Sequence, residues 1–494
     1  MNFSPVLLTD FYKISHRDQY PPATSSVYST WTARESNVEG VDHVVVFGLQ
    51  AFVRRYLVEY FKANFFDRPL EDIIGEYVRL IRNTLGLPRP PTDHLEALWA
   101  LGYLPLEIRA LPEGSLVPLR VPSVTIVNTL PEFFWLTNFI ETLFSAESWL
   151  PSTSATMAFE FRKLFERLAE ETGGDAEAVP FQGHDFSFRG MSSVEAAAAS
   201  GAGHLLSFYG TDTIPAILYL EEYYGANTDV ELVGASIPAT EHSVMSAYGN
   251  DDPDDEFTTY ERLVTDLYPS GLVSIVSDTW DLWRVLGDYL PRLRERILSR
   301  DGKVVIRPDS GDPVDILAGT EQGDHTRGDR GVVEILWDTF GGTETSKGYR
   351  VLDPHIGVIY GDQISLSSAR RVLERLKSKG FASTNVVFGI GSHTYQRTNR
   401  DTFGHAFKST AVTIGGVEKP IFKDPVTDHS NMKRSQRGRV AVTAVDAEFG
   451  SVDGLSSNDR VQGDELRLVF RDGEVFHVEK LSRIRTRLLS NLLN

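Results

Sequence analysis

The sequence predicts an α/β protein whose central part forms a β/α barrel. Seven apolar runs between about residues 181 and 393 each end in a polar tip, and an amphipathic helix often follows. Strand and helix alternating this often indicate parallel architecture, and seven repeats favour a barrel, regular or irregular, over an open sheet. The chain has 494 residues, which is enough for two or three domains.

The N-terminal part mixes helices and strands. "HVVVFG" predicts a short strand, and the apolar residues from Leu49 to Phe61 recur at the spacing of an amphipathic helix. Residues 106–110 and 117–121 alternate on either side of the turn "PEGS", which predicts a two-stranded β element. A helical stretch is expected from about Glu132 to Glu171.

The barrel region contains the seven tips "GHDFSFRG", "FYGTDT", "GASIPATEH", "VSIVSDTWD", "VVIRPDSGDP", "GVIYGDQIS" and "NVVFGIGSH". Two of its helices are "SSVEAAAAS", with an expected capping box of Ser192 and Glu195, and "SLSSARRVLERLKSK". The Gly-rich stretch from about Gly319 to Gly348 predicts an inserted loop. From about Thr394 the pattern returns to β-like alternation with a basic patch, "MKRSQRGR".

Composition excludes several classes of protein. No run approaches the roughly 18 apolar residues of a membrane span, and the start has no basic, apolar leader, so we expect a cytoplasmic protein with no membrane partner. The absence of cysteine excludes disulfides, thiolate catalysis and Cys-ligated zinc. A net charge of -19 argues against nucleic acid as a partner. A small anionic ligand would need a local basic pocket or a metal ion.

The tips concentrate groups that can bind a phosphorylated, polyhydroxylated ligand. The carboxylates are Asp185, Asp212, Asp278, Asp281, Asp309 and Asp362, the cations Arg189 and Arg307, the histidines His184, His242 and His393, and the aromatics Phe186 and Phe188. Carboxylates suit ribose hydroxyls and Mg²⁺, arginine suits phosphate, and an aromatic face suits a planar ring.

Structural roles compete with this interpretation. Asp212 could cap the helix that follows it, His242 could be a core histidine, and the aromatics of "DFSFRG" could belong to the core. The chain has no GxSxG, HExxH or GxxxxGK[ST] motif. The residues alone therefore indicate a phosphosugar enzyme on a β/α barrel and go no further.

A series of ordered motifs resembles the nicotinamide phosphoribosyltransferases, which belong to the type II phosphoribosyltransferase family. The motifs are "LTDFYKISHRDQYPP", "FFWLTNFIETL", "HDFSFRGMSS", "GTDT", "PATEHS", "VSDTWD", "IRPDSGDP", "SKGYRVL", "VIYGDQI", "NRDTFGHAFK" and "FKDPV", and the match runs from about Asn2 to Arg439 and beyond. The resemblance implies an irregular β/α barrel at residues 179–393. It also implies a β-rich α+β domain formed by residues 1–178 and 394–494.

The resemblance also implies a reaction and its participants. Phosphoribosyl would pass from phosphoribosyl pyrophosphate to nicotinamide, giving nicotinamide mononucleotide and pyrophosphate in NAD salvage, with Mg²⁺ as cofactor. ATP would phosphorylate His242 to stimulate turnover, and a homodimer would share each active site between two chains. The pyridine nitrogen has its own lone pair, so no general base is required; catalysis must stabilise an oxocarbenium-like ribose and the departing pyrophosphate.

Residue roles follow from the same resemblance. Phe186 would stack on the nicotinamide ring, Tyr12 of the other subunit would cover its second face, and Asp212 would accept a hydrogen bond from the carboxamide. Arg189 and Arg307 match phosphate-site cations, and Arg307 also lies near the ring. Asp309 matches the ribose and metal site, Gly361 and Asp362 match ribose-binding positions, and Asp278 lies close by. The surrounding basic residues are Arg34, Arg400, Lys408, Lys423 and Lys433.

One departure concerns the expected phosphate loop, where the family has a glycine run. Here the segment reads "GIGSHT", so Gly389 and Gly391 remain while Ser392 and His393 follow. A serine hydroxyl can still donate to phosphate.

Two alternatives stay open. A nicotinate phosphoribosyltransferase would run the same chemistry on the acid, but an ionised Asp212 would repel a carboxylate by about 4 kcal/mol at about 4 Å and an effective dielectric constant of about 20. The acid-using relatives tend to have an uncharged serine in the similar "GTS" motif. A non-catalytic ligand-binding protein on the same scaffold would not need Arg307, Asp309, Asp212 and His242 together.

Overall fold

A computed structural model describes residues 3–249, 252, 254–320, 329–423, 435–446 and 448–492. The chain forms two compact units. The first comprises residues 1–156, 219–226 and 398–494, and the second comprises residues 157–218 and 227–397. None of the helices in these described ranges combines the length and apolarity that a membrane span requires.

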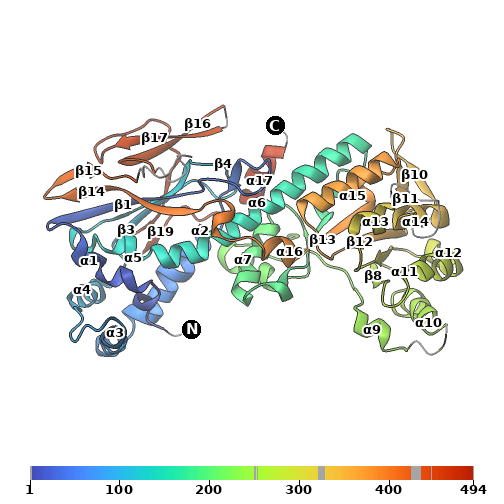
Figure 1. Ribbon diagram of the computed structural model, residues 1–494, viewed down its shortest axis with the longest axis horizontal. Helices are drawn as coiled ribbons and strands as arrows, with labels where there is room; N and C mark the ends of the chain where they lie inside the picture. The colour runs from blue at the N-terminus through green and yellow to red at the C-terminus, as the bar shows by residue number, and fades with distance from the viewer. Residues whose placement is uncertain are drawn as a thin grey trace. The chain divides into compact units, whose positions relative to one another are not determined.

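The first unit is built on a seven-stranded antiparallel sheet (Figure 1). Its order is β15-β14-β1-β5-β3-β18-β19, with bounds Val417–Pro420, Ala406–Ile414, Thr24–Thr32, Pro122–Asn128, Leu106–Ala110, Arg467–Arg471 and Glu474–Val475. Two further antiparallel pairs are β2 (His43–Val45) with β4 (Leu116–Pro118), and β16 (Arg439–Val445) with β17 (Glu448–Leu455). Strands from both ends of the chain therefore share one sheet, because β1 and β14 pair over most of their lengths.

Helices complete the first unit and its core. They are α1 (His16–Gln19), α2 (Leu49–Phe52), α3 (Leu70–Leu85), α4 (Asp93–Leu101), α5 (Leu136–Phe139) and α17 (Leu481–Leu489), and α6 (Glu141–Thr172) begins there. Trp31, Phe52 and Phe144 are buried and meet edge to face, with Trp31–Phe144 and Phe52–Phe144 ring centroids 5.2 and 5.1 Å apart. Such aromatic pairs bury large apolar areas and fix the packing of helix on sheet.

The second unit has a six-stranded parallel sheet in the order β7-β6-β13-β12-β9-β8. The strands are Gly210–Thr211, Gly183–Asp185, Val386–Ile390, Ile356–Tyr360, Val304–Arg307 and Val273–Val276. A short segment closes the ring, because Ala235 bridges Gly210 of β7 and Ala239 bridges Ser274 of β8, both in parallel. The predicted barrel is confirmed. The six strands and the bridged segment 235–239 each lead into one of the seven predicted tips.

Helices follow most of these strands, as the alternation predicts. They are α7 (Val194–His204), α8 (Ile214–Tyr224), α9 (His242–Ser246), α10 (Asp255–Arg262), α11 (Leu282–Arg284), α12 (Leu290–Leu298), α13 (Pro313–Ala318), α14 (Val332–Phe340), α15 (Leu366–Ser378) and α16 (Ser392–Tyr395). The hairpin β10 (Gly342–Glu344) with β11 (Arg350–Leu352) adds a small antiparallel element.

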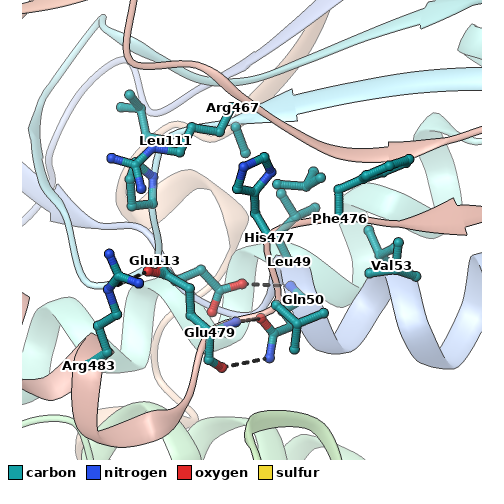
Figure 2. Close-up of a pocket in the computed structure, with 15 residues that line it drawn as sticks. Leu49, Gln50, Val53, Leu111, Glu113, Arg467, Phe476, His477, Glu479 and Arg483 are labelled. Carbon is teal, nitrogen blue, oxygen red and sulfur yellow. Dashed lines mark hydrogen bonds and ion pairs between the residues drawn. The ribbon is translucent and has the colours of Figure 1, made fainter.

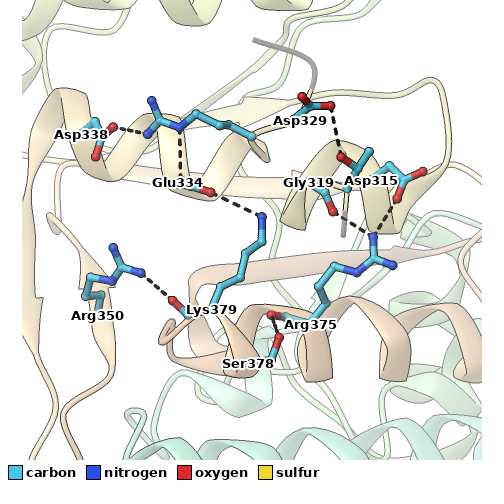
Figure 3. A network of polar contacts seen from close by, with 11 residues as sticks. Asp315, Gly319, Asp329, Glu334, Asp338, Arg350, Arg375, Ser378 and Lys379 are labelled. Atoms are coloured by element: carbon cyan, nitrogen blue, oxygen red, sulfur yellow. Dashed lines mark hydrogen bonds and ion pairs between the residues drawn. The ribbon is translucent and has the colours of Figure 1, made fainter. Parts of the chain in front are cut away.

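A polar network ties three of the helices together (Figure 3). Arg375 of α15 donates to the Asp315 carboxylate of α13 at 2.7 Å and to the carbonyl of Gly319 at 2.8 Å. Lys379, just after α15, pairs with Glu334 of α14 at 3.5 Å. Because α13 begins at Pro313, the last residue of the "RPDSGDP" tip, the network holds the helix into which this tip leads.

Three local predictions are wrong. β3 and β4 do not pair with each other; β3 pairs with β5 and β18, and β4 pairs with β2. The helix "SSVEAAAAS" is capped by Ser193, whose hydroxyl accepts from the backbone N–H of Ala196 at 3.0 Å, rather than by Ser192. The stretch expected to be a loop contains α14 and β10 within its described residues, because Val332, Val333 and Leu336 form a buried helical stripe. Alternation along a strand does not specify its pairing partner, a capping motif fits two adjacent serines, and a Gly-rich composition does not exclude a short helix.

We expect the second unit to lose stability in mild acid because of His204. This side chain is fully buried, its Nδ1 lies 2.7 Å from the Tyr395 hydroxyl, and burial lowers its pKa to about 4. The unfolded state, with a pKa of about 6.5, binds more protons, so stability is fully present above that value and falls as the pH drops toward about 4.

The maximum loss from this one group is about 3 kcal/mol. In thermal unfolding at about pH 7.5 and about pH 5, His204→Gln should show a smaller drop in Tm than the wild type. His43→Gln, at a more exposed site, should keep the wild-type drop. An unchanged drop in His204→Gln would contradict the assignment.

Candidate active site

A large cavity opens at the carboxyl ends of the barrel strands. Its volume is about 950 Å³, within the usual range for small-molecule sites. Eleven of the predicted residues line it: Phe186, Phe188, Arg189, Asp212, Arg307, Asp309, Gly361, Asp362, Gly391, Ser392 and His393. They come from five different strand ends, which a parallel barrel brings to one face.

Phe186 occupies a slot that two glycines leave open. A Cβ atom placed on Gly389 would lie 2.2 Å from the Phe186 ring, and one placed on Gly361 would lie 2.7 Å from it. The backbone N–H of Phe186 donates to the carbonyl of Ile390 at 3.1 Å. The ring is half-buried and lines the cavity, so it is available as a platform for a planar ligand.

Asp212 presents a carboxylate to the same cavity. Its Oδ1 lies 2.9 Å from His184 Nε2 and accepts from the Ser236 hydroxyl at 2.5 Å. Burial opposes ionisation, but these two partners and the charge of Arg307 outweigh it and lower the pKa of Asp212. The carboxylate makes no helix-capping bond within the described residues, so the capping alternative does not hold.

Arg307 is the last residue of β9. Its Nη2 donates to the carbonyl of Thr240 at 2.8 Å, which directs the guanidinium across the cavity. Its Nε is buried and has no hydrogen-bond partner among the described residues. A buried donor without a partner is costly, so this group is suited to a ligand acceptor.

Acidic groups gather where β9 and β12 end. Burial raises the pKa of the Tyr360 hydroxyl, and the nearby charges of Asp362, Asp309 and Asp278 raise it further. The Tyr360 hydroxyl donates to the carbonyl of Gly311 at 2.7 Å, which ties β12 to the "RPDSGDP" tip. Among the described residues, no three His, Asp or Glu side chains are placed to hold a metal ion by themselves.

His242 and Asp278 form a pair next to the cavity, whose lining includes the neighbouring Glu241. His242 Nε2 lies 3.1 Å from Asp278 Oδ1, and the Ser310 hydroxyl donates to Asp278 Oδ2 at 2.5 Å. The side chain of His242 is 49% exposed, so it is not a core histidine, whereas that of Asp278 is only 7% exposed.

The segment expected to hold a phosphate, "GIGSHT", is divided between two elements: Gly389 lies in β13, and Gly391 directly precedes α16. The Ser392 hydroxyl lies against Gly190, where an added Cβ would come within 2.1 Å of it. Arg397 Nη1 lies 3.1 Å from His393 Nε2, and burial together with this charge lowers the pKa of His393. His393 is itself part of the cavity lining.

The remaining predicted residues belong to the first unit. Arg34, Arg400, Lys408 and Lys423 are close enough that the other three charges lower the pKa of Lys408, although burial is the main cause. Tyr12 is 57% exposed. Lys433 lies outside the described residues.

Some residues of the cavity were not predicted from the sequence. Two of the aspartates that were predicted have structural roles instead. Gln396 and Arg397 line the cavity, and Ser236 and Thr240 hold its polar groups. The only sequence signal for Ser236 and Thr240 is that both lie in the tip "GASIPATEH". Asp185 is buried and accepts from the backbone N–H of Ser187, and Asp281 caps α11.

A second cavity, of about 280 Å³, lies within the first unit (Figure 2). Its polar groups bond one another: Gln50 exchanges hydrogen bonds with the backbone of Glu479 at 2.8 and 3.0 Å. Glu113 accepts from the backbone N–H of Gln50 at 2.6 Å. Because these groups are already satisfied, the cavity at the barrel end is the stronger candidate.

Two protein-family models match different parts of the chain. The model of the nicotinate phosphoribosyltransferase (NAPRTase) family matches residues 181–474, and that of the nicotinamide phosphoribosyltransferase N-terminal domain matches residues 4–65. The chain belongs to the nicotinate phosphoribosyltransferase family. Its resemblance to type II phosphoribosyltransferases is thereby confirmed.

Relatives extend the match over nearly the full length. A protein named nicotinamide phosphoribosyltransferase from Acinetobacter baylyi is 47% identical, with 99% of this chain and 98% of that protein covered. One of the same name from Xanthomonas campestris pv. campestris is 34% identical, with 97% of each covered. The human nicotinic acid phosphoribosyltransferase structure has a TM-score of 0.58 at 16% identity, covering 98% of this chain and 93% of that one, which supports the fold alone.

The Phe186 slot predicts a sharp difference between two glycine substitutions in this sheet. Gly389→Ala would drive a Cβ into the Phe186 ring and should destabilise the protein by about 1–3 kcal/mol. Gly357→Ala, on β12, meets only the flexible chain of Lys303 and one methyl of Val305 and serves as the control. Thermal unfolding should show a Tm several degrees lower for Gly389→Ala. Equal Tm values would show that the ring is not confined by this strand.

Proposed function

We propose that this protein transfers phosphoribosyl from phosphoribosyl pyrophosphate to nicotinamide, giving nicotinamide mononucleotide and pyrophosphate. The observation that carries the proposal is the ionised Asp212 carboxylate at the mouth of the barrel, beside the Phe186 platform. A carboxylate accepts from the N–H₂ of a carboxamide and repels the carboxylate of nicotinic acid. The names and full-length identities of the relatives agree with this choice.

The geometry suits a displacement that needs no protein nucleophile. The pyridine nitrogen forms the new bond to C1′ of the ribose while the bond from C1′ to the pyrophosphate oxygen breaks. Phe186 and Asp212 would hold the ring in line, and Arg307, with its free Nε, would bind oxygen that gains negative charge. Arg189, Gly391 and Ser392 would contact the phosphate, and Gly361 and Asp362 the ribose.

Mg²⁺ fits this site as a cofactor shared between protein and substrate. The Asp309 carboxylate would hold it, because Mg²⁺ commonly takes one or two carboxylates and completes its shell with phosphate oxygens and water. The ion would neutralise the departing pyrophosphate. Removal of Mg²⁺ by a chelator should abolish turnover.

We also propose a cytoplasmic homodimer in which Tyr12 and several of Arg34, Arg400, Lys408, Lys423 and Lys433 serve the partner's site. This arrangement would explain how an acidic chain supplies cations to a polyanion. Mixing Tyr12→Ala and Asp212→Ala chains tests it, because each mixed dimer would then contain one intact site. No recovery of activity in confirmed mixed dimers would contradict the shared site.

The choice of substrate should depend on Asp212. In Asp212→Ser, loss of a charged acceptor worth about 1.5–3 kcal/mol should lower kcat/KM for nicotinamide roughly 10- to 100-fold and relieve the exclusion of nicotinic acid. Asp229→Ser, on an exposed stretch away from the cavity, is the matched control. Assays of pyrophosphate release with nicotinamide and with nicotinic acid give the ratio of the two kcat/KM values. If Asp212→Ser keeps the full wild-type preference for nicotinamide over nicotinic acid, Asp212 does not determine the choice of substrate.

ATP stimulation should depend on His242. The bond from Nε2 to Asp278 leaves Nδ1 to attack the γ-phosphate of ATP, forming an N–P bond as ADP departs. His242→Ala should abolish ATP hydrolysis and stimulation while some basal transfer remains. His355→Ala, which breaks a similar histidine–aspartate pair of 2.7 Å at the opposite end of β12, should change neither. An unaltered ATP response in His242→Ala would refute the role.

A further inference from the structure

His184 is one of the polar residues at the strand tips, and the proposed reaction gives it no role. Its Nε2 lies 2.9 Å from Asp212 Oδ1, and the Ser236 hydroxyl donates to that same oxygen at 2.5 Å. We propose that His184 and Ser236 are positioning residues that set the preference for an amide, because together they hold Asp212 Oδ1 and leave Oδ2 to meet the substrate. This inference rests on the proposed function and concerns how its selectivity is built.

The sheet order places the two donors on either side of Asp212. β6, which contains His184, pairs with β7, and β7 is bridged on its other side to Ala235, next to Ser236. Asp212 directly follows β7. His184 and Ser236 therefore belong to segments on opposite sides of β7, and both contact Asp212 Oδ1.

A carboxylate needs this restraint to act as a selector. The χ2 torsion of aspartate is broad and roughly two-fold, so a free Asp212, whose side chain is 47% exposed, would sample many orientations. Two hydrogen bonds to Oδ1 remove that freedom. Within the described residues no bond engages Oδ2, so it is the oxygen left for an amide N–H.

The surroundings of His184 also determine where its proton lies. An ionised carboxylate only accepts, so Nε2 must carry the hydrogen. The opposite nitrogen, Nδ1, faces Gly210, where an added Cβ would approach within 2.8 Å. The imidazole also meets the edge of the Phe186 ring, with centroids 4.8 Å apart at 63°. His184 thus touches both the ring platform and the amide acceptor.

A purely structural role makes a different prediction. If His184 only fills space, its replacement should weaken the use of both substrates together or lower Tm, and leave the amide-to-acid ratio unchanged. If it positions Asp212, the ratio of kcat/KM values should change. That ratio is therefore the measurement to use.

The test compares paired variants. His184→Met removes the donor at similar size, and His184→Gln retains an N–H donor; Ser236→Ala and Ser236→Thr form the second pair. We expect His184→Met and Ser236→Ala each to lower the nicotinamide-to-nicotinate ratio roughly tenfold, the change expected from a positioning hydrogen bond worth about 1.4 kcal/mol. His184→Gln and Ser236→Thr should recover most of it.

The dependence on Asp212 supplies a second criterion. In an Asp212→Ser background, neither His184→Met nor Ser236→Ala should change the ratio further, because the group that they position is absent. Unchanged ratios in both single variants, or equal effects with and without Asp212, would overturn the inference. Ser236 is exposed, so its variants remain informative if His184→Met does not fold.

Failure of the proposed function is distinguishable from failure of this inference. If the wild type transfers nothing to nicotinamide, the proposed function fails, and calorimetric affinities for nicotinamide and nicotinate in the same variants then decide the positioning role. A loss of binding preference in His184→Met and Ser236→Ala would support it. An unchanged binding preference would overturn it. A wild type that prefers nicotinate would overturn both.

Discussion

The parallel pairing of the barrel strands is the constraint on which the rest of the site depends. Because all six strands of the sheet run the same way and residues 235–239 close the ring, every polar tip emerges at one face. Residues as far apart in sequence as Phe186 and Ser392 thereby line one cavity. An antiparallel arrangement would have sent alternate tips to opposite ends and divided the same residues between two surfaces.

The barrel also shows how an acidic chain can concentrate cations in one place. The net charge of -19 is spread over the chain, whereas cations are placed locally at Arg189, Arg307 and Arg397 around the cavity. A second group of cations gathers around Lys408 in the first unit, where burial and mutual repulsion lower the pKa of that lysine. The nearby Glu141 acts in the opposite direction, and the proposed phosphate would add a further anion to these cations.

Selectivity for a neutral amide over an acid is, on this account, a property of a small hydrogen-bonded group rather than of one residue. Burial alone would push Asp212 toward its neutral form, which could not repel a carboxylate. The donors on Oδ1 and the nearby guanidinium reverse that tendency and lower its pKa. The same contacts that keep the carboxylate charged also orient it, so charge and direction cannot be altered independently.

The sequence by itself determined the fold class, the seven strand tips and most of the residues that line the cavity. It could do so because apolar runs with polar ends follow from local chemistry and backbone periodicity. Pairing partners were decided only by the tertiary structure, since β3 and β4 alternate as a hairpin would and yet join different strands. The sequence likewise did not determine the contact between His184, Ser236 and Asp212. That contact depends on β7 lying between β6 and the segment at Ala235, which are separated along the chain. Local patterns specify which groups are polar and exposed at a strand end; only the order of strands in the closed sheet specifies which of them meet.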